Sequence, residues 1–493
     1  MQTAANRLSA RPANAPDGPP LRGSHGTLDI EELLEKQARS RFSITVFLLC
    51  CLVMLADGFD NQAINYAAPA IIAEWGINRA LMTPVFNLSV AGAIAGAVVF
   101  SALGDRYGRR PATIAAVAVF GAFSLAIPLA RDLTSLALLR LGASFGVGGG
   151  MPMAITLACD YAKRDRRAWC ASLLFLGYTA GSSGGGWLAA SIIPPFGWRA
   201  VFYLGGFAGV AIAAALLAAL PESLKFLALR RPGDARIASY AQRLLPGAEI
   251  SRDTTFTITA TAASGAPLRK LFADRRSAMT LSLWFALGFA FATHFFLSQW
   301  LTTLLTPVIG FADAARTQAL FQAGAGFSFV FGYLIDRRGI PVTALAMFAA
   351  ALPVAAIGWT AQWNTGSAMG LALISGILVL GGDIGISALP CIIYPPAIRS
   401  TATGAAFGVG RVGAILGPLL AGLLIWLNVP LSTIFIISAL PVLCSGAACV
   451  VLDRVVNGTR KRETISEKSE HEPRRDPDGV LAPRSSFLAS RLK

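Results

Sequence analysis

Two aspartates stand three residues apart inside the first long apolar segment, in the tetrapeptide Asp57-Gly58-Phe59-Asp60. On a helix, this spacing places both carboxyl groups on one face. A charged Asp near the centre of a bilayer costs about 2.5–3.5 kcal/mol on insertion scales, so its presence suggests a function. Desolvation and mutual repulsion disfavour ionisation of both groups at once. Asp57 and Asp60 are therefore candidates for proton coupling, with Asp57 slightly favoured; the alternative is a structural ion pair with a neighbouring helix.

Two arginines lie inside apolar segments. Arg140 is expected at a depth similar to that of Asp60, where it either pairs with the aspartates or binds a substrate carboxylate through its planar fork. Arg411 has no acidic neighbour in its own segment and is the first candidate for the carboxylate of an anionic substrate. The alternatives are static ion pairs, with Arg411 paired to Asp383.

His294 is the only histidine within an apolar segment. A histidine side chain ordinarily titrates near pH 6.5, which suits a proton relay. The alternative is a neutral, hydrogen-bonded histidine packed between helices. Phe295 and Trp300 follow it and are candidates to face a flat substrate ring, although packing or lipid contact is the commoner role of such residues.

A charged cluster, Asp105-Arg106-Tyr107-Gly108-Arg109-Arg110, lies between the second and third apolar segments, and Asp336-Arg337-Arg338-Gly339 takes the equivalent place in the second half of the chain. Charges at helix ends can pair with another helix in one conformation only and so shift a conformational balance. Asp160, which precedes Lys163 and Arg164, is assigned to the same network; the alternative role of the basic residues is to set topology. The predicted gating residues are Asp105, Arg106, Gly108, Arg109, Arg110, Asp160, Asp336 and Arg337.

The composition predicts a membrane protein. Of 493 residues, 54% are hydrophobic and only 14% charged, against roughly a quarter charged in soluble domains. A bilayer core of about 30 Å needs about 20 apolar residues per helix. Segments of that length recur six times, then, after a polar stretch, six times more: 42–66, 82–103, 112–130, 135–158, 168–193, 200–221, 278–304, 317–334, 341–360, 366–389, 402–426 and 430–452.

The expected organisation is two six-helix halves, 42–221 and 278–453, joined by a cytoplasmic loop, 222–277. Residues 1–41 form a mostly disordered cytoplasmic segment with a short amphipathic helix at 27–36, capped by Thr27 or Asp29. Residues 454–493 are expected to be a disordered cytoplasmic tail.

The basic residues are distributed unevenly. Of 42 Lys and Arg, 36 fall in one set of alternating loops and tails and four in the other. The positive-inside rule then places both termini in the cytoplasm and favours an even number of spans. The net charge of +15 is therefore a topology signal, and no nucleic-acid partner is expected.

Signatures of enzymes are missing from the sequence. The seven cysteines lie in or beside apolar segments, form no CxxC motif and have no metal-ligand spacing with histidine. No nucleophile–base pair, Walker sequence or GxGxxG motif after a strand occurs. We therefore expect no catalytic residue, metal, cofactor or ATP-driven pumping.

At the charged cluster, the chain resembles the major facilitator superfamily, with Ser101 in place of the first glycine of the pattern G-x-x-x-D-R-x-G-R-R. The motif Asp57-Gly58-Phe59-Asp60 resembles the D-G-x-D signature of the aromatic acid:proton symporter family, of the 4-hydroxybenzoate/benzoate permease type. The resemblance covers about residues 27–453. Asp160 departs from it, since a glutamate is expected there.

The resemblance implies an all-α major facilitator fold with 12 transmembrane helices in two halves. It further implies a monomeric inner-membrane importer for a small aromatic carboxylate such as a hydroxybenzoate, coupled to protons and serving aromatic compound catabolism. The alternatives are an exporter, or a transporter of another organic anion, a sugar acid or a drug. A sensor or membrane enzyme is the alternative from another class.

Overall fold

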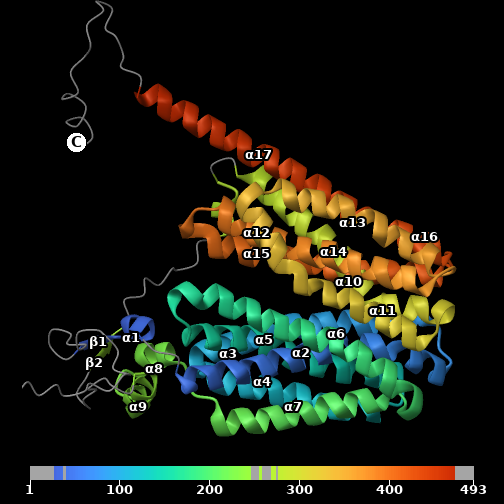
Figure 1. Ribbon diagram of the computed structural model, residues 1–493, viewed down its shortest axis with the longest axis horizontal. Helices are drawn as coiled ribbons and strands as arrows, with labels where there is room; N and C mark the ends of the chain where they lie inside the picture. Colours follow the sequence, from blue (N-terminus) through green and yellow to red (C-terminus); the bar gives the residue numbers. More distant parts are fainter. Residues whose placement is uncertain (1–26, 37–39, 246–254, 258–267, 274–275, 472–493) are drawn as a thin grey trace, which may run out of the picture.

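The computed structural model describes residues 27–36, 40–245, 255–257, 268–273 and 276–471. Two helical bundles lie side by side, one from each half of the chain (Figure 1). Within the described ranges, the only strands are the short parallel pair β1 (Thr27–Asp29) and β2 (Thr255–Thr257). The expected all-α fold in two halves is confirmed.

The long helices correspond to the twelve expected spans. The first half holds α2 (Arg41–Trp75), η1 (Arg79–Met82) with α3 (Thr83–Tyr107), α4 (Arg109–Ala126) with η2 (Ile127–Leu129), α5 (Leu133–Asp160), α6 (Arg167–Phe196) and α7 (Arg199–Ala219). The second half holds α10 (Ser277–Ile309), α11 (Phe311–Ala323) with η5 (Gly324–Phe327) and α12 (Ser328–Arg338), α13 (Pro341–Thr360), α14 (Thr365–Ile393), α15 (Pro396–Trp426), and α16 (Leu431–Ser438) with α17 (Leu440–His471).

Eleven of these helical segments are long and apolar enough to cross a membrane, judged over the described residues. Helix α6 is the expected span outside that set. Its many glycines and serines, concentrated at 181–186, lower its hydropathy. Its 30 residues extend about 45 Å, and it packs along α2 and α11. It therefore occupies the place of the expected fifth span. Its small polar residues contribute to packing against the neighbouring helices.

Glycines allow α2 and α6 to approach each other closely. A Cβ atom at Gly58 would collide with the backbone of Tyr178, and one at Gly181 would collide with the backbone of Leu55. Small residues at such crossings are typical of membrane helices, where van der Waals packing replaces the hydrophobic effect. This crossing fixes the position of Asp57 and Asp60 on α2.

The two halves meet through α2 and α10, α6 and α11, and α3 and α15. Near the start of α3, the Phe86 ring packs edge-on against Trp300 at 5.1 Å between centroids, and Thr83 contacts Gly422. These contacts lie at the end of the bundle remote from α8 (Leu224–Arg230) and α9 (Ala235–Leu244) (Figure 1). The halves are thus closed against each other at that remote end.

The segment expected as a central loop contains folded elements. Helices α8 and α9 lie with α1 (Ile30–Lys36) at one end of the first half, and η4 (Leu268–Leu271) precedes α10 (Figure 1). The expected amphipathic helix starts at Ile30 rather than Thr27, because residues 27–29 pair with β2. Of the two proposed caps, Asp29 is the one used: its carboxylate accepts from the Glu31 N–H at 2.8 Å.

The C-terminal segment differs from the expectation of disorder from residue 454. Helix α17 continues to His471 and extends beyond the bundle (Figure 1). No proline occurs between Pro441 and Pro473; the residue before a proline is disfavoured in a helix, so α17 can continue until that point. The disorder expected for 1–26 and for 472–493 falls outside the described residues.

Candidate functional site

Asp57 is buried without a polar partner. Its side chain is 0% exposed, and neither carboxyl oxygen has a hydrogen-bond partner among the described residues. The backbone of Met151 lies nearby without hydrogen-bond geometry. A Cβ added at Gly150 of α5 would lie 2.7 Å from Asp57 Oδ2, so only glycine leaves room for this carboxyl group.

Asp60, one turn further along α2, is fully paired. Arg140 Nη1 donates to Asp60 Oδ2 at 2.8 Å, and Nη2 donates to the Asp60 carbonyl oxygen at 2.6 Å. The Ser124 hydroxyl donates to Asp60 Oδ1. The Asp60 and Arg140 side chains are each only 1% exposed. In this conformation Arg140 therefore holds α2 and α5 together, and a substrate carboxylate would have to displace Asp60 to reach it.

In the second half, His294 pairs with Asp383. His294 Nδ1 lies 2.7 Å from Asp383 Oδ2 and joins α10 to α14. Arg411, for which Asp383 was the alternative partner, makes no ion pair or side-chain hydrogen bond among the described residues. Arg411 is thus a partly buried cation without a counter-ion among the side chains that the structure describes.

Aromatic rings connect His294 to the helix that carries Arg411. The Phe295 ring stacks on His294 at 4.8 Å between centroids, and Phe291 lies 6.1 Å from His294. Phe407, one turn before Arg411 on α15, lies 6.2 Å from Phe291. These rings form an aromatic cluster, defined here as Phe291, Phe295 and Phe407 with His294.

Trp300 lies apart from the aromatic cluster. Its side chain is fully buried, its indole N–H donates to the Pro418 carbonyl oxygen at 3.2 Å, and its ring packs on Phe86. In this conformation Trp300 is part of the packed contact between the two halves. The structure therefore brings Phe295, but not Trp300, beside His294.

An apolar groove on the outside of the second half does not include His294 or Arg411. An apolar groove of about 400 Å³ runs between α10 and α15, and its walls include the exposed residues Phe285, Phe289, Val412 and Leu416. His294 and Arg411 are absent from its lining. Since successive helix residues differ by about 100° in direction, both side chains lie on other faces of α10 and α15.

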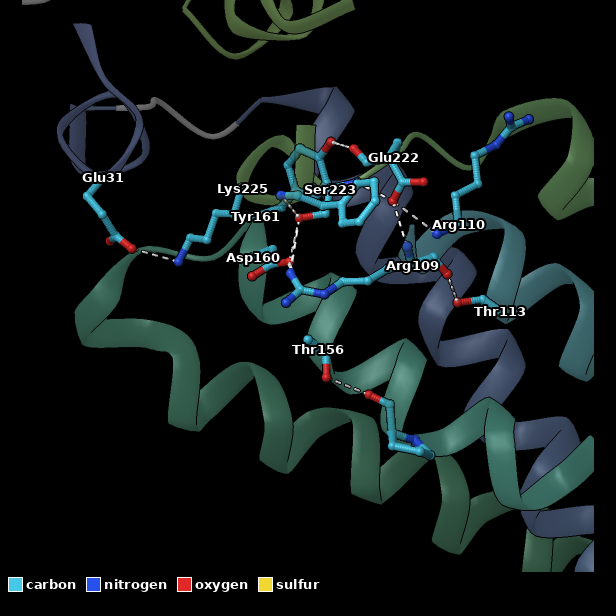
Figure 2. Close-up of polar contacts among 12 residues, drawn as sticks. Glu31, Arg109, Arg110, Thr113, Thr156, Asp160, Tyr161, Glu222, Ser223 and Lys225 are labelled. Atoms are coloured by element: carbon cyan, nitrogen blue, oxygen red, sulfur yellow. Dashed lines mark hydrogen bonds and ion pairs between the residues drawn. The ribbon is translucent and has the colours of Figure 1, made fainter. Parts of the chain in front are cut away.

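The expected gating cluster forms a network at the end of the first half (Figure 2). Arg109 pairs with Asp160, and the Ser223 hydroxyl donates to Asp160 Oδ2 at 2.6 Å. Glu222 Oε1 accepts the backbone N–H groups of Arg109 at 2.9 Å and Arg110 at 3.1 Å. The network connects the start of α4, the end of α5 and the entry to α8 in the connecting segment, and none of these residues belongs to the second half.

Gly108 is required for this network. Its φ is +118°, a conformation that other residues avoid. A Cβ at this position would also collide with the carboxylate of Glu222. Gly108 therefore lets the loop turn while Glu222 binds the first N–H groups of α4, a favourable site for an anion.

The remaining expected gating residues make no ion pair between the halves among the described side chains. The Arg106 guanidinium lies 5.3 Å from the Tyr107 ring centroid, and that of Arg337 lies 4.5 Å from Tyr333. Asp105 lies near Arg109 without a direct bond. The Asp336 side chain falls outside the described ones.

Sequence reasoning missed Glu222, Ser223, Ser124 and Phe407. For the first two, a signal was present in Pro221-Glu222-Ser223, which follows directly after an apolar segment. Ser223 caps α8 by accepting the Phe226 N–H at 3.2 Å. No local pattern marks Ser124 or Phe407, because their roles depend on which helix packs beside their own.

Comparisons with known proteins agree with this architecture. The family model described as Major Facilitator Superfamily matches residues 50–392 and 319–491. The chain is 31% identical to the gallate transporter of Pseudomonas putida, over 85% of this chain and 94% of that protein. It is 33% identical to the 4-hydroxybenzoate transporter PcaK of Pseudomonas putida, over 79% and 88% respectively.

The fold is also similar to that of a bacterial homolog of the human lysosomal transporter Spinster, in an inward-facing and occupied conformation. The TM-score is 0.67 at 16% identity, over 85% of this chain and 98% of that one. At this identity the likeness concerns the fold alone. The chain is a multi-pass membrane protein that belongs to the major facilitator superfamily, a family of transporters rather than enzymes, and to the aromatic-acid transporters within it.

Proposed function

We propose that the protein imports an aromatic carboxylate, such as a hydroxybenzoate, together with protons by alternating access. The observation that carries the proton coupling is Asp57, a fully buried carboxyl group without a hydrogen-bond partner among the described residues. A carboxyl group in an apolar site is tolerated when it is protonated, and intramembrane acids of this kind serve proton pathways.

Asp57 is the preferred proton carrier because the other candidates are engaged. Asp60 is bonded to Arg140 and Ser124, and His294 is bonded to Asp383. A permanent counter-charge stabilises one protonation state, whereas transport requires both states to be visited. We assign Asp60 and Arg140 to the structural support of Asp57. They would affect proton coupling if Arg140 exchanges its bond to Asp60 for another partner during transport.

For the substrate, Arg411 and the aromatic cluster form the best-supported site. Arg411 supplies a cation that has no counter-ion in the described part of the chain, and a guanidinium binds a carboxylate through two parallel N–H donors. Phe291, Phe295 and Phe407 supply flat apolar surfaces suited to a ring. The names of the two relatives, a gallate and a 4-hydroxybenzoate transporter, fit this chemistry.

We further propose that both termini and the end bearing α8 and α9 are cytoplasmic, as the lysine and arginine distribution indicates. The Arg109–Asp160–Glu222 network would then lie at the cytoplasmic end, beside Asp105, Arg106 and, in the second half, Asp336 and Arg337. The contact at Phe86 and Trp300 then lies at the outer end, where the two halves meet in this conformation. The cytoplasmic cluster acts as a gate that engages the other half when the outer end opens.

The test is uptake of radiolabelled 4-hydroxybenzoate into proteoliposomes with an imposed pH gradient, acidic outside. We expect accumulation by the wild-type protein and its loss in Asp57→Asn. Asp313→Asn, a surface carboxylate on α11, is the matched control and should retain uptake. Full gradient-driven accumulation by Asp57→Asn would refute the assignment of Asp57.

A different organic anion as substrate, or export, is distinguished in the same preparation. Benzoates should compete with the labelled substrate, whereas sugar acids and dicarboxylates should not. Accumulation only with the opposite pH gradient would indicate export and contradict the proposed direction.

A further inference from the structure

His294 has one engaged ring nitrogen and one free one. Nδ1 is bonded to Asp383, while Nε2 has no partner among the described residues. The His294 side chain is 25% exposed, whereas that of Asp383 is 5% exposed. The free nitrogen therefore belongs to the accessible side of the pair.

Asp383 determines which chemistry the free nitrogen offers. A carboxylate accepts the Nδ1 proton, and this hydrogen bond fixes both the tautomer and the ring orientation. The Nε2 atom of the neutral imidazole is then a hydrogen-bond acceptor. A ligand group that binds there must be a donor.

The surroundings of His294 suit an aromatic anion. On parallel helices, Gly413 packs against Gly288 and Gly417 against Ala292, so Arg411 lies level with residue 286 of α10. It is thus eight residues, or about 12 Å, from the level of His294 along α10. Phe291 lies between the two positions, whereas Phe407 is level with residue 282, beyond Arg411, and its ring lies 6.2 Å from that of Phe291. The acceptor, an aromatic ring and the cation therefore follow one another along the contact between α10 and α15, with a second ring beyond the cation.

We infer that His294, positioned by Asp383, accepts a hydrogen bond from a ring hydroxyl of the substrate while Arg411 holds its carboxylate. The protein thereby selects aromatic acids with a hydroxyl group remote from the carboxylate over unsubstituted ones. This inference rests on the proposed function and specifies its substrate class. His294 is the specificity-determining residue, and Asp383 is a positioning residue.

Ligand variation tests the inference on the wild-type protein. Unlabelled benzoate, 3- and 4-hydroxybenzoate and 4-methoxybenzoate compete with labelled 4-hydroxybenzoate in proteoliposomes. One neutral hydrogen bond contributes about 0.5–1.5 kcal/mol, so a hydroxybenzoate should compete about 3- to 10-fold better than benzoate. The methoxy compound, which has no donor, should compete no better than benzoate. Equal competition by the hydroxy and methoxy compounds would overturn the inference.

Variants of His294 test whether this residue causes the preference for hydroxybenzoates. His294→Phe should lower the preference for 4-hydroxybenzoate over benzoate by the same factor, so that the two compounds compete about equally. His294→Gln retains an acceptor and should restore part of the preference. Phe289→Leu, on the lipid side of the same helix, is the matched control. Loss of gradient-driven benzoate uptake in both His294 variants would instead identify His294 as a proton carrier and refute its role as a selector.

Asp383→Asn provides a readout that a purely structural role would not give. The asparagine amide donates to Nδ1, so the proton moves to Nε2 and the free nitrogen becomes a donor. The preference should then shift from 4-hydroxybenzoate toward 4-methoxybenzoate. An equal loss of affinity for both compounds would contradict the positioning role.

The two proposals fail in different ways. If the wild-type protein takes up no aromatic acid, the proposed function is wrong and the inference falls with it. If it takes up benzoate and 4-hydroxybenzoate with equal affinity, only the inference is wrong.

Discussion

The helix pair α2 and α5 in the first half corresponds to α10 and α14 in the second. Asp57 is the 17th residue of α2 and faces Gly150, the 18th residue of α5. His294 is the 18th residue of α10 and faces Asp383, the 19th residue of α14. At nearly equivalent positions, the first half therefore has a carboxyl group opposite a glycine, and the second half has a carboxyl group opposite a histidine.

This difference separates two uses of a buried acid. Asp383 has a hydrogen-bond partner, His294, on its Oδ2 atom, and so it can position another side chain. Asp57 has none within the described ranges, because glycine at position 150 supplies neither a donor nor a counter-charge. Such a group can change protonation state without breaking an ion pair. The halves are thus similar in fold but assigned to different tasks, the first to protons and the second to the substrate.

The largest expected effect on stability comes from breaking the ion pair of the first half. Arg140→Leu leaves Asp60 buried without its counter-charge, which should destabilise the protein by about 3–5 kcal/mol. Thermal unfolding in detergent measures this loss. The double variant Asp60→Leu with Arg140→Leu removes both charges and should recover much of the stability. A double variant as unstable as the single one would show that the pair is not the source of the effect.

Arg411→Gln tests whether the second half binds the anion. Hydrogen bonds to charged groups contribute about 1.5–3 kcal/mol, so substrate affinity should fall by about 10- to 100-fold. Ligand-induced shifts of the unfolding temperature measure the affinity. Since Arg411 has no protein partner among the described residues, the stability of the ligand-free protein should change little. A large loss of that stability would indicate a structural arginine instead.

His294→Phe measures how strongly the second pair holds its helices together. Loss of the imidazole leaves the buried Asp383 carboxyl group without its hydrogen bond, which should destabilise the protein by about 1–3 kcal/mol, less than Arg140→Leu because the His294 side of the pair is partly exposed. Unfolding in the same detergent allows direct comparison with Arg140→Leu. A loss as large as that caused by Arg140→Leu would remove the proposed contrast between the halves.

The smallest effect is expected at Glu31, outside the membrane-spanning helices. Partial burial acts to raise its pKa, but hydrogen bonds from Lys225 and Arg167 hold the pKa below its ordinary value. A lowered folded-state pKa means that the stabilisation is present above the unfolded value, near pH 4.3, and is lost as pH falls through the folded value. Glu31→Gln should cost less than about 1 kcal/mol at pH 7, because the side chains of these pairs are partly open to solvent, which screens their attraction. The difference between variant and wild type should vanish on acidification; a difference that grows below pH 4 would contradict this.

The sequence by itself determined the membrane fold. Apolar segments of bilayer length and a one-sided distribution of basic residues are local properties of the chain, set by the lipid solvent. The spacing of Asp57 and Asp60 likewise fixes their common face, because helix periodicity is local. The motif at 104–110 indicated the charged loop, and the structure adds its partner Glu222.

Only the tertiary structure decided the partners. Asp383 binds His294 rather than Arg411, and Asp60 rather than Asp57 takes Arg140. These choices depend on how helices far apart in sequence rotate and cross, and close packing at glycines such as Gly58 and Gly150 fixes that rotation. The sequence shows which ionisable residues lie in the membrane-spanning segments. Only the packing of the helices determines which of these residues form pairs and which do not.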